Sequence, residues 1–264
     1  MTIAAIQMCS STNVDDNIFN AENLIAESAN KGAKVIVLPE MFATMISRDK
    51  PIDGVKEVFG KGKIQSFLSQ QAKKYNVYIV GGTIPIATNT NKVTSTCLVL
   101  DNKGIVIARY DKIHLFDVKI SDNESYSESD TIENGSELTV VDTPVGKLGL
   151  IVCYDVRFQD QCRKLVNLGA EIITVPAAFT VPTGKSHWEL LLRSRAIDNL
   201  CYVVGAAQSG NHENGRNTYG HSMIVNPWGE ILVEKKDPGQ GIIFTTIDLP
   251  YLYKIRTNFP VLKY

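Results

Sequence analysis

Apolar and polar residues follow two periods along the chain, and these predict strands and amphipathic helices in alternation. Short apolar runs rich in Val and Ile are typical of buried strands, whereas apolar residues spaced about three to four positions apart mark one helix face. Helices are expected at residues 13–31, 64–76, 159–168 and 187–199. Strands are expected at residues 2–8, 33–40, 77–82, 171–177, 201–208, 221–227, 230–235 and 241–249.

Two further regions predict hairpins, because a turn sequence separates two apolar runs. Residues 94–112 turn at Asn102-Lys103-Gly104, and residues 138–153 turn near Pro144-Val145-Gly146. Strands joined by helices in some places and by hairpins in others favour an α/β fold with mixed sheets. No linker-like or repeated segment divides the chain, so we expect residues 1–264 to form one domain.

The overall composition narrows the classes of partner. The formal net charge is −1, so no strongly basic face is expected and nucleic acid is excluded as a partner. No apolar segment approaches the roughly 20 residues that span a membrane, and the N-terminal segment MTIAAIQMCSSTNVDD predicts a first strand rather than a signal peptide. Cysteines 9, 97, 153, 162 and 201 lack paired metal-type spacing, which favours a reducing cytoplasm over a disulfide or zinc framework.

Three reactive residues stand where apolar segments stop. Glu40 closes KVIVLPE, Lys112 closes GIVIARYDK, and Cys153 is expected as the last residue of the strand LGLIVC. Ligands of α/β sheets gather at the carboxyl ends of strands, so we expect the three to converge. A carboxylate can then take the thiol proton, while an ammonium and the backbone N–H of Tyr154 hold an oxyanion. This set predicts acyl transfer without histidine.

Each residue also has a simpler interpretation. A buried cysteine is often a small hydrophobe, Glu40 could cap a loop, and Lys112 could be a solvated strand end. A cysteine protease that pairs Cys153 with His114 or His221 is a further alternative, as are a non-catalytic binding protein and an acyl transferase.

Taken together, LPEMF (38–42), YDKIHLFD (110–117) and GLIVCYDVRF (149–158) resemble the three signature segments of the nitrilase, or carbon–nitrogen hydrolase, superfamily. The similarity covers nearly the whole chain. It implies a four-layer α-β-β-α sandwich with two mixed β-sheets, in which Glu40 is the general base, Lys112 the oxyanion stabiliser and Cys153 the nucleophile. It also implies hydrolysis of a small-molecule amide through a thioester, no metal or organic cofactor, and a homodimer, which is common among relatives.

The same resemblance extends to residues around the triad. Many relatives carry a second glutamate after the lysine strand, which corresponds to Glu128 and would orient Lys112 and the substrate nitrogen; a solvated loop carboxylate is the alternative. Many relatives continue the cysteine segment as Arg-Phe-Pro-Glu, where this chain has Gln159-Asp160 after Phe158. We expect this departure to change the support of the turn rather than the reaction. Arg157 is expected to be structural, paired with Asp155 or with a neighbouring subunit.

Two groups of amidases within the superfamily are most similar to the chain. The segment CYVVGAAQSGNHENGRNTYGHSM resembles the group that acts on deaminated glutathione, whereas KIHLFD and LRSRAIDN resemble the omega-amidases, which act on 2-oxoglutaramate and 2-oxosuccinamate. We favour the first group. Both kinds of substrate carry an α-keto acid, so a cationic clamp is expected, for which Lys185, His212 and Arg216 are the candidates.

Overall fold

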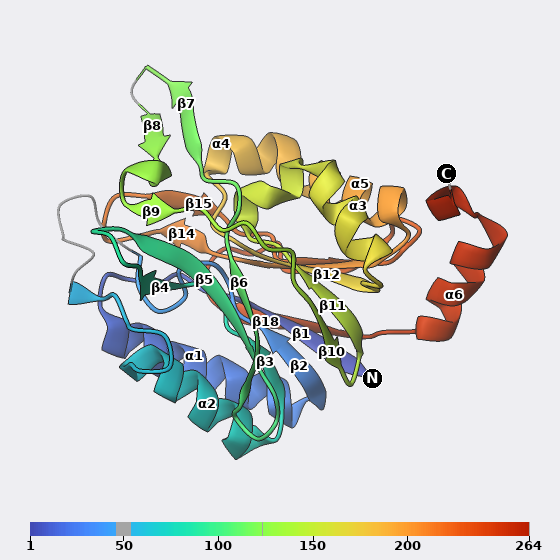
Figure 1. Ribbon diagram of the computed structural model, residues 1–264, viewed down its shortest axis with the longest axis horizontal. Helices are drawn as coiled ribbons and strands as arrows, with labels where there is room; N and C mark the ends of the chain where they lie inside the picture. Colours follow the sequence, from blue (N-terminus) through green and yellow to red (C-terminus); the bar gives the residue numbers. More distant parts are fainter. Residues whose placement is uncertain (46–53, 123, 264) are drawn as a thin grey trace.

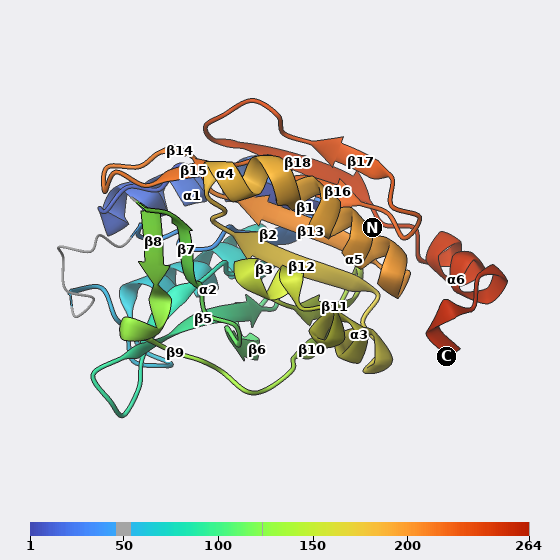
Figure 2. The same ribbon diagram turned by 90° about the horizontal axis from the view of Figure 1, so that it is seen from above.

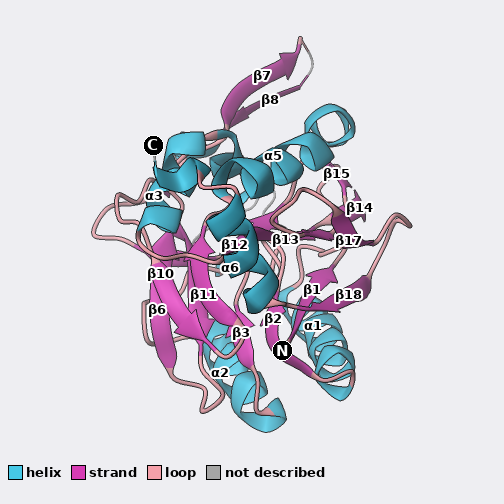
Figure 3. Cartoon of the chain, turned by 90° about the vertical axis from the view of Figure 1, so that its right-hand side faces the viewer, coloured by secondary structure: helices cyan, strands magenta, loops and turns pink. Residues whose placement is uncertain are grey.

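A computed structural model describes residues 1–45, 54–122 and 124–263 of the chain. Two β-sheets stack face to face, and helices cover the outer side of each (Figures 1 and 3). Helices α1 (Val14–Asn30) and α2 (Lys63–Tyr75) lie on the first sheet, and α3 (Gln159–Asn167) and α5 (Glu189–Asn199) lie on the second. The arrangement is the expected α-β-β-α sandwich.

The first sheet is mixed and is buried on both faces. Among the described residues its order is β18-β1-β2-β3-β5-β4, with β6 and β9 also paired to β5. Ile3 and Ala5 of β1 pack in the core between the sheets, and Ala4 and Ile6 pack in the core under α1 and α2. Because both faces are covered, the strand is continuously apolar. The strands of this sheet are β1 (Thr2–Gln7), β2 (Ala33–Val37), β3 (Tyr78–Val80), β4 (Ile84–Ala87), β5 (Val93–Leu100), β6 (Val106–Asp111), β9 (Ile132–Glu133) and β18 (Gly241–Thr246).

The second sheet has the order β10-β11-β12-β13-β16-β17 within the described residues. Its central strands β11, β12 and β13 are parallel, β10 and β16 run antiparallel to them on either side, and β17 pairs antiparallel with β16. A backbone pairing of Met8 with Gln208 joins the end of β1 to the end of β13, so the sheets also meet at the edge where these strands end. The strands are β10 (Val140–Thr143), β11 (Gly146–Leu150), β12 (Ile172–Ala177), β13 (Tyr202–Ala207), β16 (Met223–Val225) and β17 (Ile231–Glu234).

Several elements were not predicted by the apolar pattern. The hairpin of β7 (Asp117–Ser121) and β8 (Glu124–Ser127) projects from the body (Figures 1 and 3) and is short, with Val118 and Ile120 as the aliphatic residues of β7. The hairpin of β14 (Ser209–Asn211) and β15 (Asn217–Tyr219) is shorter still and mostly polar. The segment before α5 forms α4 (Val181–Thr183) and a π-helix (Gly184–Trp188), so the helix predicted at 187–199 has a longer, irregular start.

Helix α6 (Leu249–Asn258) was also not predicted, and it lies at one end of the molecule, outside the four layers (Figure 2). Asp248 caps its first turn by accepting from the N–H of Tyr251 at 3.0 Å. Arg256 holds the helix to the second sheet by donating to the carbonyls of Leu200 and Ala170, both at 2.9 Å. No helix in the described part of the chain is long and apolar enough to span a membrane.

Candidate active site

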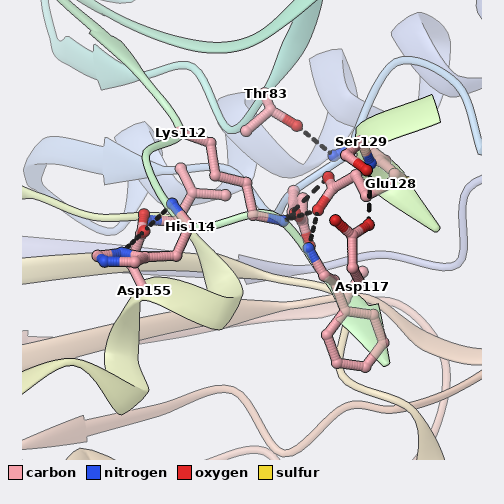
Figure 4. A network of polar contacts seen from close by, with 12 residues as sticks. Thr83, Lys112, His114, Asp117, Glu128, Ser129 and Asp155 are labelled. Carbon is pink, nitrogen blue, oxygen red and sulfur yellow. Dashed lines mark hydrogen bonds and ion pairs between the residues drawn. The ribbon is translucent and has the colours of Figure 1, made fainter. Parts of the chain in front are cut away.

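Lys112 is the centre of a buried ionic cluster. It follows β6 directly, and its side chain is only 2% exposed. Its Nζ donates to Glu40 Oε1 at 2.9 Å and to Glu128 Oε2 at 2.9 Å. Figure 4 shows the lysine side chain extended toward the Glu128 carboxylate. Glu128 also accepts from the N–H of Phe116 at 2.7 Å, so it belongs to this cluster and is not a solvated loop residue.

Cys153 lies beyond its strand, and the prediction that it is the last strand residue is wrong. β11 ends at Leu150, and Cys153 opens a 3₁₀ helix, Cys153–Arg157. The strand stops because the N–H of Val152 donates to the carboxylate of Asp155 at 2.9 Å, which closes a turn. Cys153 has φ of +49°, a left-handed backbone that strains a residue with a side chain. The strained turn brings the thiol close enough to the Glu40 carboxylate for that charge to raise the pKa of Cys153.

The loop that carries Glu40 is held from two sides. β2 ends at Val37, so Glu40 stands three residues beyond the strand. The loop packs so closely on Gly82 that a Cβ there would lie 2.1 Å from the carbonyl oxygen of Pro39. From the second sheet, Gln208 Nε2 donates to the Glu40 carbonyl at 3.0 Å. These contacts explain how residues of both sheets fix one carboxylate.

Asp155 ties the cysteine turn to the lysine strand, a role that the sequence did not indicate. The buried carboxylate accepts from the Tyr110 hydroxyl at 2.7 Å and from the N–H of His114 at 2.9 Å. It also bonds His114 Nδ1 at 2.8 Å, as Figure 4 shows. Tyr110 and His114 each lie two residues from Lys112, one before it and one after it. In the sequence, this placement of Tyr110 and His114 on either side of Lys112 within YDKIHLFD was the one feature that could have suggested a shared partner.

Burial and charge set the protonation of the nucleophile and of the lysine. Burial raises the pKa of the Cys153 thiol, and the Glu40 carboxylate raises it further against the opposing effects of Lys112 and a backbone hydrogen bond with Ala178. Burial lowers the pKa of Lys112, but the charges of Glu128 and Glu40 together outweigh it and hold that pKa well above its usual range. The resting site therefore holds a neutral thiol beside a carboxylate base and a permanent cation.

The histidines are engaged elsewhere, which removes support for a cysteine–histidine pair. His114 bonds Asp155 and stacks on Phe158 with ring centroids 3.5 Å apart, and His221 Nδ1 bonds Glu234 at 2.6 Å. Neither is hydrogen-bonded to Cys153 within the described residues. The same part of the chain contains no group of three His, Cys, Asp or Glu side chains placed to bind a metal ion.

The three candidate clamp residues lie in different surroundings. Arg216, between β14 and β15, donates from Nη2 to the carbonyl of Ala178 at 2.6 Å, which brings it beside the cysteine turn. His212 is buried, and its ring nitrogens bond the Ser10 carbonyl at 2.8 Å and Thr218 Oγ1 at 2.7 Å. Lys185 is exposed on the π-helix and makes no hydrogen bond or ion pair with the described residues. Of these three candidates, Arg216 is the one that lies beside the cysteine turn and has N–H donors without a hydrogen-bond partner among the described residues.

Arg157 is a second cation at the site, and its predicted pairing with Asp155 is wrong. The guanidinium lies 5.5 Å over the Tyr154 ring and 5.2 Å over the Phe179 ring, and Nη1 is 3.3 Å from His187 Nδ1. Its Nε is buried and has no hydrogen-bond partner among the described residues. Tyr154, which directly follows the nucleophile, packs edge-on against Phe116 with centroids 5.1 Å apart. The rings of Tyr154 and Phe179, an aromatic wall, thus support the Arg157 guanidinium beside the cysteine turn.

Gln159, the departure from the usual Arg-Phe-Pro-Glu segment, has a structural role. Its Oε1 accepts from Arg195 Nη1 at 2.6 Å and from Asn199 Nδ2 at 3.1 Å. A proline could not make these bonds, because it has no polar side chain. Gln159 therefore links the start of α3, just after the cysteine turn, to α5.

The chain is similar to known proteins over nearly its whole length. The sequence profile of the family described as carbon-nitrogen hydrolase matches residues 2–257. The chain is 41% identical to a deaminated glutathione amidase of Yersinia enterocolitica, over 99% of this chain and 92% of that protein. It is 36% identical to an omega-amidase of Homo sapiens, over 99% and 93% respectively. The crystal structure of the C. elegans NitFhit protein superposes with a TM-score of 0.91 at 35% identity, covering all of this chain and 64% of that longer one.

Proposed function

The chain belongs to the carbon–nitrogen hydrolase family, and on this premise we propose that it is a cysteine-dependent amidase whose substrate is deaminated glutathione. The observation that carries the proposal is the buried Lys112, bonded to both Glu40 and Glu128, beside a cysteine on a strained turn. A buried lysine between two carboxylates is costly to assemble and is typical of functional sites. The proposed catalytic residues are Glu40, Lys112 and Cys153, supported by Glu128 and the N–H of Tyr154.

The reaction begins with transfer of the thiol proton of Cys153 to Glu40. The sulfur attacks the amide carbon, and the charge that develops on the carbonyl oxygen is stabilised by the Lys112 ammonium and the Tyr154 N–H. Glu40 returns its proton to the departing nitrogen, so the carbon–nitrogen bond breaks and a thioester remains on Cys153. Water, deprotonated by Glu40, then releases the acid and the free thiol. Lys112 keeps its proton throughout, which agrees with its raised pKa.

Two substrates are compatible with this chemistry. Deaminated glutathione is favoured by the 41% identity to an amidase of that name and by the segment CYVVGAAQSGNHENGRNTYGHSM, in which Gly210, His212 and Arg216 follow Ala-Ala-Gln. The alternative is 2-oxoglutaramate, favoured by the 36% identity to an omega-amidase. Both carry an anionic α-keto acid, for which Arg157, a guanidinium over the ring of Tyr154 with no carboxylate partner in the described residues, is the candidate cation.

Release of 2-oxoglutarate by the purified protein tests the proposal. The two substrates are compared at equal low concentration with wild type and with Cys153→Ala. A higher kcat/KM on deaminated glutathione, absent in the variant, is expected. Preference for 2-oxoglutaramate would make the protein an omega-amidase, and release that requires an added amine would make it a transferase. Turnover of neither would overturn the substrate assignment.

We also propose that the protein is a homodimer. Partly exposed apolar residues gather near the cysteine turn, α5 and the C-terminal segment, namely Phe158, Ile197, Trp228 and Phe259. An open cavity of about 430 Å³ lies among them, lined by Gln159, Arg163, Ile197, Asp198, Phe259 and Val261. Sedimentation of wild type at twice the monomer mass, with Ile197→Glu shifted toward the monomer, is the expected result; a monomeric wild type would exclude it.

We place the protein in the cytoplasm. All five cysteines are unpaired, which suits a reducing compartment. Fractionation of cells with an antibody to the chain tests this, and recovery outside the cytoplasm would contradict it.

A further inference from the structure

Arg216 carries a charge that the described part of the protein does not neutralise. Its guanidinium has five N–H donors. Among the described residues, Nη2 donates to the Ala178 carbonyl at 2.6 Å and Nη1 lies 3.8 Å from Met41 Sδ. Its Nε is buried without a partner, and no described carboxylate forms an ion pair with it. Arg216 is half-buried, and a guanidinium partly withdrawn from water without a carboxylate partner has the character of a site for an anion.

The neighbours of Arg216 place it on the side from which the amine departs. Met41 directly follows Glu40, the proposed proton donor to the leaving nitrogen. Tyr126, over whose ring the guanidinium lies at 5.4 Å, comes two residues before Glu128. Arg216 is therefore held between the segments that carry the two carboxylates. Both arginines contact the segment after β12, Arg216 at the Ala178 carbonyl and Arg157 at the Phe179 ring, but it is Arg157 that lies over a ring of the cysteine turn, that of Tyr154.

From this placement we propose that Arg216 binds a carboxylate at the far end of the leaving amine, and that it thereby selects amides of amino acids and short peptides over simple carboxamides. The inference rests on the proposed amidase function and deepens it. The dipeptide released from deaminated glutathione ends in such a carboxylate, whereas 2-oxoglutaramate releases ammonia. One guanidinium thus distinguishes the two substrate groups without touching the reacting atoms.

The experiment compares deaminated glutathione with its C-terminal amide, in which the terminal carboxylate is replaced by a neutral carboxamide. Both release 2-oxoglutarate, so one assay gives kcat/KM for each. The wild type is expected to favour the carboxylate form by about 10- to 100-fold, the range for a charged hydrogen-bonded pair, mainly through KM. Arg216→Met should lose that factor on the carboxylate form and stay within about threefold of wild type on the amide. Arg216→Lys should lie between, since it keeps the charge and loses the planar fork.

A matched control is Arg193→Met, since Arg193 also donates to a backbone carbonyl, that of Gly229 at 2.9 Å, but is paired with Glu189. It should leave both rates unchanged. Equal wild-type rates on the two substrates, or an equal loss of both in Arg216→Met, would overturn the inference while leaving the amidase function in place. Absence of wild-type turnover on both would overturn the proposed function and this inference with it.

Discussion

The Tyr110 hydroxyl donates to Asp155 Oδ2 at 2.7 Å, and this contact joins the strand that precedes Lys112 to the turn that begins at Cys153. Burial, reinforced by the Asp155 charge, holds the pKa of Tyr110 well above its usual range, so the hydroxyl remains a donor. The relative position of nucleophile and ammonium is thus set by a residue pair that takes no part in the proposed reaction.

Loss of the Asp155 charge should damage the fold more than loss of the Tyr110 hydroxyl. Asp155→Asn leaves an amide facing N–H and O–H donors, with an expected loss of about 2–4 kcal/mol in the free energy of unfolding. Tyr110→Phe removes one bond and should cost about 1–2 kcal/mol. Urea unfolding of both variants measures this. Equal losses would mean that Asp155 acts through its contact with Tyr110 alone.

Cys153→Ala should abolish turnover and leave the fold intact. The residue is buried, but the change removes a single sulfur atom, and alanine meets the same backbone strain at φ +49°. We expect kcat to fall by at least about 10⁴-fold, as for other nucleophile deletions. Thermal unfolding serves as the control, and a large fall in Tm would show that the residue is structural.

Glu40→Gln and His114→Ala separate the proposed triad from a cysteine–histidine mechanism. Glutamine cannot accept the thiol proton, so kcat should fall by about 10²–10⁴-fold. His114→Ala should lower stability, because the Asp155 bond and the Phe158 stack are lost, but should keep turnover within about tenfold. Steady-state rates at matched folded fraction decide the matter. Full activity of Glu40→Gln, or a dead His114→Ala that remains folded, would contradict the triad.

The fall of kcat/KM at high pH, its alkaline limb, should begin at a pH above the ordinary pKa of a thiol. The pKa values of Cys153 and Lys112 are both raised, so both groups keep their protons as the pH passes the usual cysteine value of 9.0. The rate should therefore stay level up to that pH. The charge of Glu128 raises the pKa of Lys112 more than that of Glu40 does, so Glu128→Gln should move the alkaline limb to lower pH. A pH–rate profile of both proteins tests this; an unmoved limb would show that Lys112 does not govern it.

Gln159→Pro should destabilise the protein, although it restores the segment that many relatives carry. Proline suits the first turn of a helix, but here it removes the bonds to Arg195 and Asn199. Losing these hydrogen bonds to two buried side chains should cost about 1–3 kcal/mol, measured by chemical unfolding. A more stable variant would mean that the network contributes nothing.

The sequence alone determined most of the local elements and predicted which residues react. Apolar periodicity placed the main core strands and helices, because a side chain's face follows from its position in a strand or helix. It missed the β7–β8 hairpin, β14–β15 and α6, whose residues are mostly polar or mixed. The order of the LPEMF, YDKIHLFD and GLIVCYDVRF segments pointed to Glu40, Lys112 and Cys153.

Only the tertiary structure decided how these residues are connected. Lys112 meets Glu40 across 72 positions of sequence, and Tyr110 meets Asp155 across 45. Local spacing does not specify such contacts, because they depend on how two sheets stack and where their strands stop. The same reason explains why Arg157, four positions after the nucleophile, could be assigned to Asp155 from sequence and yet lies over an aromatic wall. Its direction depends on Phe179 and His187, which come from other segments, together with Tyr154 of its own turn.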